Sequence, residues 1–173
     1  FMTPLHIRQA GIKAINDGTT RYTDNLGLSE LRLAFSDYLK RRFEIHFDPQ
    51  TEIIVTVGGS EGIDMSLRLL IDSGDEILIP EPSYVCYDPI TRLSGGKVVA
   101  LPTKREDNFK ITPELLRSKI TDKTKVLILS YPNNPTGAIM DKADLEVIAP
   151  IIIEHNLIVI SDEIYAELNY TDT

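Results

Sequence analysis

The sequence predicts an α/β fold, a three-layer α/β/α sandwich built around a mostly parallel sheet. Short runs of β-branched and aliphatic residues alternate with longer segments whose apolar residues recur every three or four positions. The short runs are apolar throughout rather than at every second residue, which is typical of strands covered on both faces. Such alternation of strands and helices favours a parallel sheet with helices on its two sides.

Five of the apolar runs are expected to form strands. The first, at residues 53–57, ends in a pair of glycines that indicates a turn. The other four lie at residues 76–79, 97–101, 126–129 and 157–160. Each run is short and is followed by polar or turn-forming residues, so each strand end can carry functional side chains.

Six segments have the helical spacing of apolar residues. Gly18 follows the first of them, as glycine often follows a helix, and Thr112 is a candidate N-cap for the fifth. Pro89 is a weak position in the fourth, because proline cannot donate a backbone hydrogen bond. The expected helices cover residues 4–16, 29–43, 60–71, 84–93, 113–119 and 142–154.

Composition and charge exclude several classes of function. The 173 residues are enough for one domain, with 42% apolar and 25% charged residues and a formal net charge of −8. That charge argues against a nucleic-acid or acidic-membrane partner, although backbone amides can still bind a small anion. The single cysteine rules out an internal disulfide and fits a cytoplasmic location. No apolar run is long enough to span a bilayer, and the three scattered histidines predict no metal site.

The loop after the first expected strand could bind an anion. Residues 58–62 read Gly-Gly-Ser-Glu-Gly and open a helix. Glycines allow the backbone to approach a ligand closely, and the free N–H groups of a helix start favour a phosphate. The alternative is a plain glycine turn in which Ser60 caps the helix.

Beyond the second strand, two prolines at residues 80–82 stiffen the chain before Tyr84. A ring held in this way could stack on a flat ligand. The alternative is that Tyr84 is an ordinary half-buried aromatic residue.

Two further motifs follow the last two strands. Residues 130–137 read Ser-Tyr-Pro-Asn-Asn-Pro-Thr-Gly, which places asparagine amides between prolines as positioned donors and acceptors. Residues 161–165 read Ser-Asp-Glu-Ile-Tyr, so Asp162 lies at the tip of an apolar strand, where a carboxylate needs compensation. Asp162 is therefore either paired within the structure or placed to hold a cationic group of a ligand. The alternative for the first motif is a turn that only connects two elements, but its density of prolines and asparagines favours a functional role.

Together these segments resemble the fold type I pyridoxal-phosphate enzymes, in the class I/II aminotransferase family. Residues 22–32 are similar to that family's Y-x-x-x-x-G-x-x-x-L-R stretch, residues 133–137 match N-N-P-T-G, and residues 161–165 match S-D-E-x-Y. The resemblance covers nearly the whole chain in the family's order. It implies the large domain of a pyridoxal-phosphate-dependent transferase and, for the parent protein, transfer of an amino group between an L-amino acid and a 2-oxo acid.

The resemblance also implies a role for each matched residue. Asp162 would pair with the ring nitrogen of pyridoxal 5'-phosphate, which makes the cofactor a better electron sink. Asn134 and Tyr165 would hydrogen-bond the ring's phenolic oxygen. Tyr84 would stack on the ring.

The phosphate and the subunit arrangement complete the implied site. Gly59, Ser60 and Glu61 would hold the phosphate through backbone amides and the Ser60 hydroxyl. Tyr22 resembles the tyrosine that reaches the cofactor of the neighbouring subunit, which implies a homodimer.

The chain departs from the family in what it lacks. The family's Schiff-base lysine lies beyond S-D-E-x-Y, and no lysine follows Lys142 here, so no catalytic residue is assigned. We expect residues 1–173 to be a partial large domain, with 1–50 a helical region leading into it and the small domain and the rest of the large domain absent. The strand at 53–57 would then lack a partner. The fragment alone is expected to be inactive and to fold poorly without the rest of the protein.

Three alternatives remain open at this stage. The same residues would serve a pyridoxal-phosphate-dependent C–S lyase or an aminocyclopropane carboxylate synthase-like enzyme. A nucleotide- or S-adenosylmethionine-binding Rossmann-like domain would use residues 58–62 as its glycine loop and Glu81 to hold a ribose. A non-catalytic remnant would keep the fold without the activity.

Overall fold

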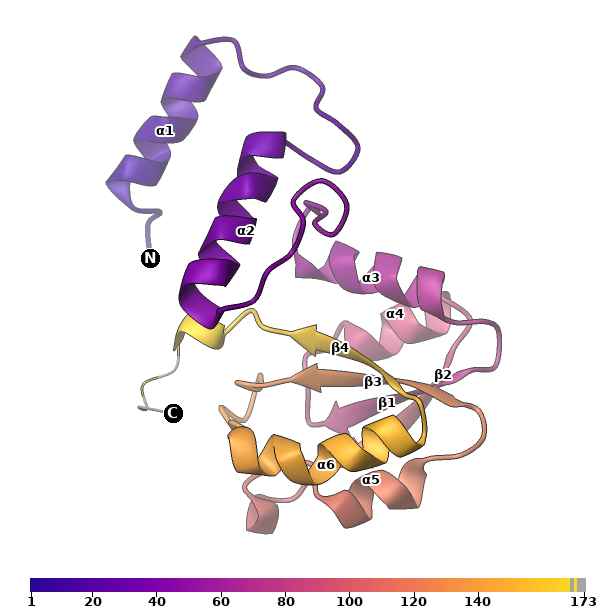
Figure 1. Cartoon of the computed structure of the whole chain (residues 1–173). Coiled ribbons are helices and arrows are strands. Elements are labelled where there is room, and N and C mark those ends of the chain that lie inside the picture. Colours follow the sequence, from indigo (N-terminus) through magenta and orange to yellow (C-terminus); the bar gives the residue numbers. More distant parts are fainter. Residues whose placement is uncertain (169, 171–173) are drawn as a thin grey trace. The chain divides into compact units, whose positions relative to one another are not determined.

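The structure is a computed structural model that describes residues 1–168 and residue 170 (Figure 1). The chain divides into two compact units, Phe1–Thr56 and Val57–Thr173. That residues 1–173 belong to one large domain stays a prediction.

The first unit contains two helices, α1 (Leu5–Asn16) and α2 (Ser29–Phe43), which agree with the sequence to within one residue. Arg32 of α2 is buried, with 5% of its surface exposed, and its guanidinium donates to the carbonyl oxygens of Pro49 at 2.7 Å and Gln50 at 3.3 Å. These bonds fasten the loop that follows α2 to the helix.

The prediction of a strand at residues 53–57 is wrong. The segment belongs to no helix or strand, and the N–H of Val55 donates to the carbonyl oxygen of Leu26 at 3.0 Å. Gly27 has a φ of +93°, and a Cβ there would lie 2.6 Å from the Cβ of Val55. The extended chain thus packs on the turn before α2. β-Branched residues favour an extended backbone, but a strand also needs a neighbouring strand for its hydrogen bonds.

The second unit contains a four-stranded sheet in the order β2-β1-β3-β4, and every pair of strands is parallel. The prediction of an α/β fold with a parallel sheet is confirmed. Two short 3-10 helices lie at Arg105–Asp107 and Ala166–Leu168. The remaining elements are α3 (Gly59–Leu70), β1 (Glu76–Glu81), α4 (Tyr87–Leu93), β2 (Lys97–Pro102), α5 (Pro113–Lys119), β3 (Thr124–Ser130), α6 (Lys142–Glu154) and β4 (Ile158–Asp162).

Helices cover both faces of this sheet, with α3 and α4 on one side and α5 and α6 on the other (Figure 1). Successive side chains of β1 therefore pack in separate hydrophobic clusters on the two faces of the sheet. Ile77 and Ile79 pack with Leu67 of α3, whereas Leu78 packs with Leu116 of α5 and Ile148 of α6. This arrangement explains why the strands are apolar at every position rather than at alternate ones.

Two helix starts test the sequence reasoning in detail. The hydroxyl of Thr112 accepts from the N–H of Leu115 at 3.2 Å, so the predicted cap of α5 is confirmed. Helix α4 begins at Tyr87, three residues later than expected. Pro89 thereby falls in the first turn, where the backbone N–H has no partner within the helix, and the proline costs little.

Glu76 lies at the start of β1 with 4% of its surface exposed. Its carboxylate accepts from the ammonium of Lys97 at 2.8 Å and from the hydroxyl of Thr121 at 2.6 Å. These donors, led by Lys97, hold the pKa of Glu76 below its ordinary value of 4.5. The carboxylate is therefore a structural connection between β1, β2 and the turn before β3.

Replacing Glu76 with glutamine removes the charge but keeps an acceptor. We expect Glu76→Gln to lower the free energy of unfolding at pH 7 by about 1–2 kcal/mol, because the bonds it weakens are charge-assisted. Since the folded-state pKa is lowered, this contribution is present above the unfolded-state value of 4.5 and is lost as the pH falls through the folded-state pKa. Urea unfolding between pH 7 and about pH 3 should show the difference shrinking towards acid.

Glu146→Gln is the matched control. Glu146 is exposed and lies 3.7 Å from the exposed ammonium of Lys142, a surface pair that contributes little. We expect a change within about 0.5 kcal/mol at either pH. Equal losses in the two variants would contradict the role given to Glu76.

Candidate functional site

A cavity of about 470 Å³ lies beyond the carboxyl ends of the strands and beside the start of α3. Six of the eight residues that the sequence nominated line it. Four of them lie at or just after the carboxyl ends of β1, β3 and β4, which parallel strands bring to one edge of the sheet, and the other two open α3. The lining consists of Gly59, Ser60, Ile63, Tyr84, Tyr87, Ser130, Asn134, Asp162, Ile164 and Tyr165.

The start of α3 forms one wall of this cavity. Its N-cap is Gly58, whose φ is +84°, and a Cβ built on Gly59 meets no atom within 4 Å. The alternative in which Ser60 caps the helix is wrong, since Ser60 lies within the first turn. The carboxylate of Glu61 instead accepts from the N–H of Val57, so its side chain serves the helix start and does not line the cavity.

Asp162 ends β4 and also lines the cavity, and both of its oxygens have a donor. Oδ2 accepts from the hydroxyl of Tyr87 at 2.7 Å, and Oδ1 accepts from the N–H of Ile164 at 3.1 Å. An ionised carboxylate has about four lone-pair sites, so these two bonds leave acceptor capacity for a ligand.

Tyr87 is the main lining residue that the sequence reasoning missed. Its side chain is 1% exposed, and burial, followed by its bond to Asp162, raises its pKa above the ordinary value of 10.0. Its ring meets that of Tyr84 edge to face, with centroids 5.8 Å apart. The spacing of two tyrosines three residues apart was the available signal, but the segment was assigned to a longer helix.

The two adjacent asparagines after β3 have different roles. The Oδ1 of buried Asn133 accepts from the hydroxyl of Thr136 at 2.9 Å, and its carbonyl oxygen accepts from the N–H of Gly137 at 2.8 Å. Asn134 lines the cavity, and its side-chain amide has no hydrogen-bond partner among the described residues. Asn133 therefore closes the turn, which leaves the amide of Asn134 available to a ligand.

The remaining nominated residues are aromatic. Tyr84 and Tyr165 line the cavity, and Tyr84 is 40% exposed. Tyr22 lies in the first unit, between α1 and α2, and its side chain is fully exposed there. Its contact with a neighbouring subunit stays a prediction.

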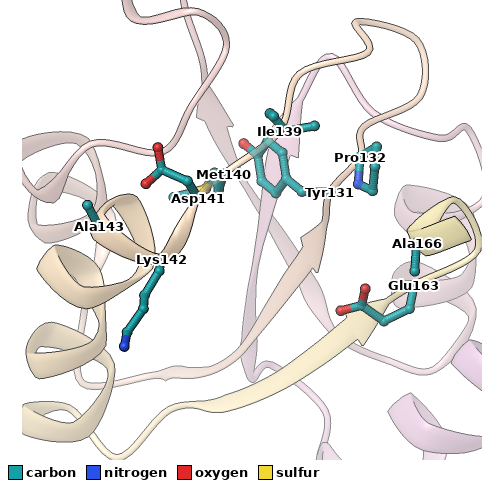
Figure 2. Close-up of a pocket in the computed structure, with 9 residues that line it drawn as sticks. All are labelled: Tyr131, Pro132, Ile139, Met140, Asp141, Lys142, Ala143, Glu163 and Ala166. Carbon is teal, nitrogen blue, oxygen red and sulfur yellow. The ribbon is translucent and has the colours of Figure 1, made fainter. Parts of the chain in front are cut away.

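Figure 2 shows another cavity, of about 600 Å³, between the start of α6 and the segment after β4. Its carboxylates already accept hydrogen bonds from residues close to them in the chain. Asp141 caps α6 by accepting from the N–H of Asp144, and Glu163 accepts from the hydroxyl of Ser161. No residue nominated from the sequence lines it, so the first cavity is the better candidate site.

The described residues lack both a metal-binding cluster and a membrane-spanning helix. They contain no group of three or more histidine, cysteine, aspartate or glutamate side chains arranged to hold a metal ion. In the same part of the chain, no helix combines the length and apolar character needed to cross a membrane.

The cavity combines groups of complementary chemistry. Asp162 can accept from a cationic or protonated group, and the amide of Asn134 and the phenol of Tyr165 can hydrogen-bond a polar substituent. The backbone N–H groups of the first turn of α3 favour an anion. The arrangement suits a small flat ligand with an anionic substituent and a protonated ring atom.

Comparison with known proteins identifies similar chains. The family described as aminotransferase class I and II matches residues 1–173. An aspartate aminotransferase from Pyrococcus abyssi is 44% identical over 172 residues, which are 99% of this chain and 44% of that protein. An aromatic-amino-acid aminotransferase from Thermococcus litoralis is 42% identical over 170 residues, 98% of this chain and 44% of that protein.

Solved structures agree with these matches. The crystal structure of an aromatic aminotransferase from Pyrococcus horikoshii OT3 superposes with a TM-score of 0.97 at 45% identity, covering 100% of this chain and 46% of that one. A Thermus thermophilus aspartate aminotransferase with maleate gives 0.94 at 38% identity, covering 99% and 44%. The chain thus spans less than half the length of these relatives.

The two asparagines provide a test of the site's construction. We expect Asn133→Ala to lower the free energy of unfolding by about 1–3 kcal/mol, because it leaves buried donors of the turn unsatisfied. Asn134→Ala should change it by no more than about 0.5 kcal/mol, because that side chain has no partner to lose. Urea unfolding without added ligand measures both, and equal losses would contradict the division of roles.

Proposed function

The chain belongs to the class I and II aminotransferase family, and we propose that the protein containing it transfers an amino group between an L-amino acid and a 2-oxo acid with pyridoxal 5'-phosphate. The gathering of Gly59, Ser60, Asn134 and Asp162 around one cavity carries the proposal. Members of this family use pyridoxal phosphate. Membership also removes the alternative of a nucleotide- or S-adenosylmethionine-binding domain.

The cavity suits this cofactor in size and in the polarity of its walls. Its volume of about 470 Å³ is within the range of small-molecule sites. Asp162 has spare acceptor capacity for a protonated ring nitrogen, and the amide of Asn134 is unpaired among the described residues. The open space over Gly59 lets an anion approach the start of α3.

When bound, pyridoxal phosphate supplies an electron sink for the negative charge that develops at the amino acid's α-carbon. The residues of this chain would tune and orient that group. Asp162 would hold the proton on the ring nitrogen, and Asn134 and Tyr165 would hydrogen-bond the phenolic oxygen. Tyr84 would stack on the ring face.

The phosphate is assigned to the helix start. The backbone N–H groups of Gly59, Ser60 and Glu61 and the hydroxyl of Ser60 would donate to its oxygens. Because backbone amides carry this contact, an acidic chain with a net charge of −8 can bind an anionic cofactor.

The amine for the cofactor is assigned to a residue outside this chain. No lysine is among the described residues that line the cavity. The relatives are more than twice as long as the chain, so the remainder of a similar protein has room for this lysine.

The subunit arrangement and the compartment complete the proposal. A homodimer would let the exposed side chain of Tyr22 reach the cofactor of the neighbouring subunit. The cytoplasm suits a protein whose single cysteine, Cys86, is free in the structure.

The full-length protein tests the proposal directly. We expect it to gain an absorbance band with pyridoxal phosphate and, after borohydride reduction and digestion, one modified lysine peptide. It should convert an amino acid and a 2-oxo acid into the exchanged pair. Release of a thiol from a cysteine conjugate in place of exchange would indicate a C–S lyase, and absence of cofactor binding would contradict the proposal.

Asp162→Ala should lower the rate of amino-group transfer by at least about 100-fold, because it removes the anion opposite the ring nitrogen. Glu163→Gln is the control, since the neighbouring carboxylate accepts from Ser161 and does not line the cavity. We expect its rate to stay within about twofold of the parent. Similar losses in the two variants would contradict the role of Asp162.

The isolated segment 1–173 provides a further test. With pyridoxal phosphate and borohydride it should give no specific lysine adduct, and it should transfer no amino group, because it supplies no amine at the cavity. Mass spectrometry of the digest and an exchange assay measure the two outcomes. Amino-group transfer by the segment alone would contradict the assignment of the amine to a residue outside this chain.

A further inference from the structure

Tyr87 connects the core of the second unit with the candidate site. It is the first residue of α4, packs in the core formed by α3, α4 and one face of the sheet, and is 1% exposed. Its hydroxyl nevertheless reaches the cavity edge and donates to Oδ2 of Asp162 at 2.7 Å, a contact between residues 75 positions apart. The phenol is therefore held in place by the core around its ring.

The sheet register explains how one hydroxyl meets two polar partners. Ser130 and Asp162 are paired across β3 and β4, so they lie side by side at the carboxyl edge. The hydroxyl of buried Ser130 donates to the oxygen of Tyr87, and Tyr87 donates to Asp162. The result is a hydrogen-bond chain in which each donor strengthens the next.

The hydroxyl of Tyr87 stays a donor over the whole physiological range of pH. Burial raises its pKa above the ordinary value, and the neighbouring charge of Asp162 adds to this, with a smaller effect of the Cys86 thiol. The proton in the bond therefore belongs to the tyrosine, and Asp162 is the acceptor.

Two donors act on the carboxylate of Asp162, the hydroxyl of Tyr87 on Oδ2 and the N–H of Ile164 on Oδ1. They fix the plane of the carboxylate, because one donor is a backbone group and the other is a hydroxyl on a buried ring. The remaining lone pairs of Asp162 are therefore held in one orientation for a ligand.

We infer that Tyr87 is the positioning residue of this site: through its hydrogen bond it holds the Asp162 carboxylate in the orientation that a cofactor's protonated ring nitrogen needs, so that the proton between them stays on the nitrogen. Ser130 supports it by donating to the Tyr87 oxygen. The inference rests on the proposed function, since it assumes that the ring nitrogen of pyridoxal phosphate faces Asp162.

The test uses the full-length protein loaded with pyridoxal phosphate that carries ¹⁵N in the ring. The ¹⁵N chemical shift reports where the proton lies, whatever the rate of turnover. We expect the parent protein to give the shift of a protonated ring nitrogen at pH 7. Tyr87→Phe should move the shift towards that of an unprotonated pyridine and raise the dissociation constant of the cofactor about tenfold, because a charge-assisted bond is lost.

Tyr131→Phe is the matched control. Its half-buried hydroxyl donates to the carbonyl oxygen of Phe109 at 2.9 Å, so the same chemical change removes one tyrosine hydrogen bond outside the cavity. It should leave the ¹⁵N shift and the dissociation constant unchanged. An equal effect in the control would show that Tyr87 acts only through general packing, and would overturn the inference.

The outcomes separate the two proposals. If the parent protein binds the cofactor with a protonated ring and Tyr87→Phe gives the same shift, the inference fails and the proposed function stands. If the parent protein binds no cofactor, both fail. Should Tyr87→Phe not fold, Ser130→Ala replaces it, with a smaller shift in the same direction expected, and an unchanged shift in that variant overturns the inference.

Discussion

The site depends on a parallel sheet that is covered on both faces. Helices on the two sides leave the strands no polar face, so charged groups can lie only at the two edges where strands begin or end. All four strands run the same way, and their carboxyl ends therefore meet at one edge. The pairing of Ser130 with Asp162 in adjacent strands is a direct result, and Tyr87 can contact both because α4 packs on that side.

The two edges of the sheet hold carboxylates of different character. At the amino edge, Glu76 accepts from Lys97 and Thr121, with Thr124 near at 3.5 Å, and these partners occupy most of its acceptor capacity. At the carboxyl edge, Asp162 has two donors and an adjacent cavity. At both edges, hydrogen-bond donors offset the free-energy cost of placing a carboxylate beside an apolar core. Only Asp162 keeps acceptor sites for a ligand, which is why one carboxylate is structural and the other is assigned to binding.

Sequence reasoning succeeded where the signal is local. The ends of α2 and α6 follow from apolar spacing, and the cap at Thr112 follows from its side chain and the proline after it. The motif residues Asn134 and Asp162 were found because they follow apolar runs, and strand ends carry ligands in such sheets. Their assignment to one edge needed only the expectation that the strands are parallel.

Sequence reasoning failed where a contact with a residue far away in the chain determines the local structure. The run at 53–57 has the composition of a strand, but Val55 bonds to Leu26 and not to the sheet. Tyr87 was overlooked because nothing near it in the chain reveals that Asp162, 75 residues later, accepts a hydrogen bond from its hydroxyl. The adjacent residues Asn133 and Asn134 are equivalent in the local sequence. Only the folded structure shows that the side chain of Asn133 hydrogen-bonds within the turn and that of Asn134 does not.

The sequence alone determined the class of fold, the places of most helices and strands, and the motifs that assign the chain to its family, because periodicity and turn chemistry act between residues close together in the chain. The tertiary structure decided which side chains of those motifs share a cavity, which donor holds Asp162, and that Glu61 turns away. Those outcomes depend on contacts between segments far apart in the chain, and local propensity carries no information about which segments meet.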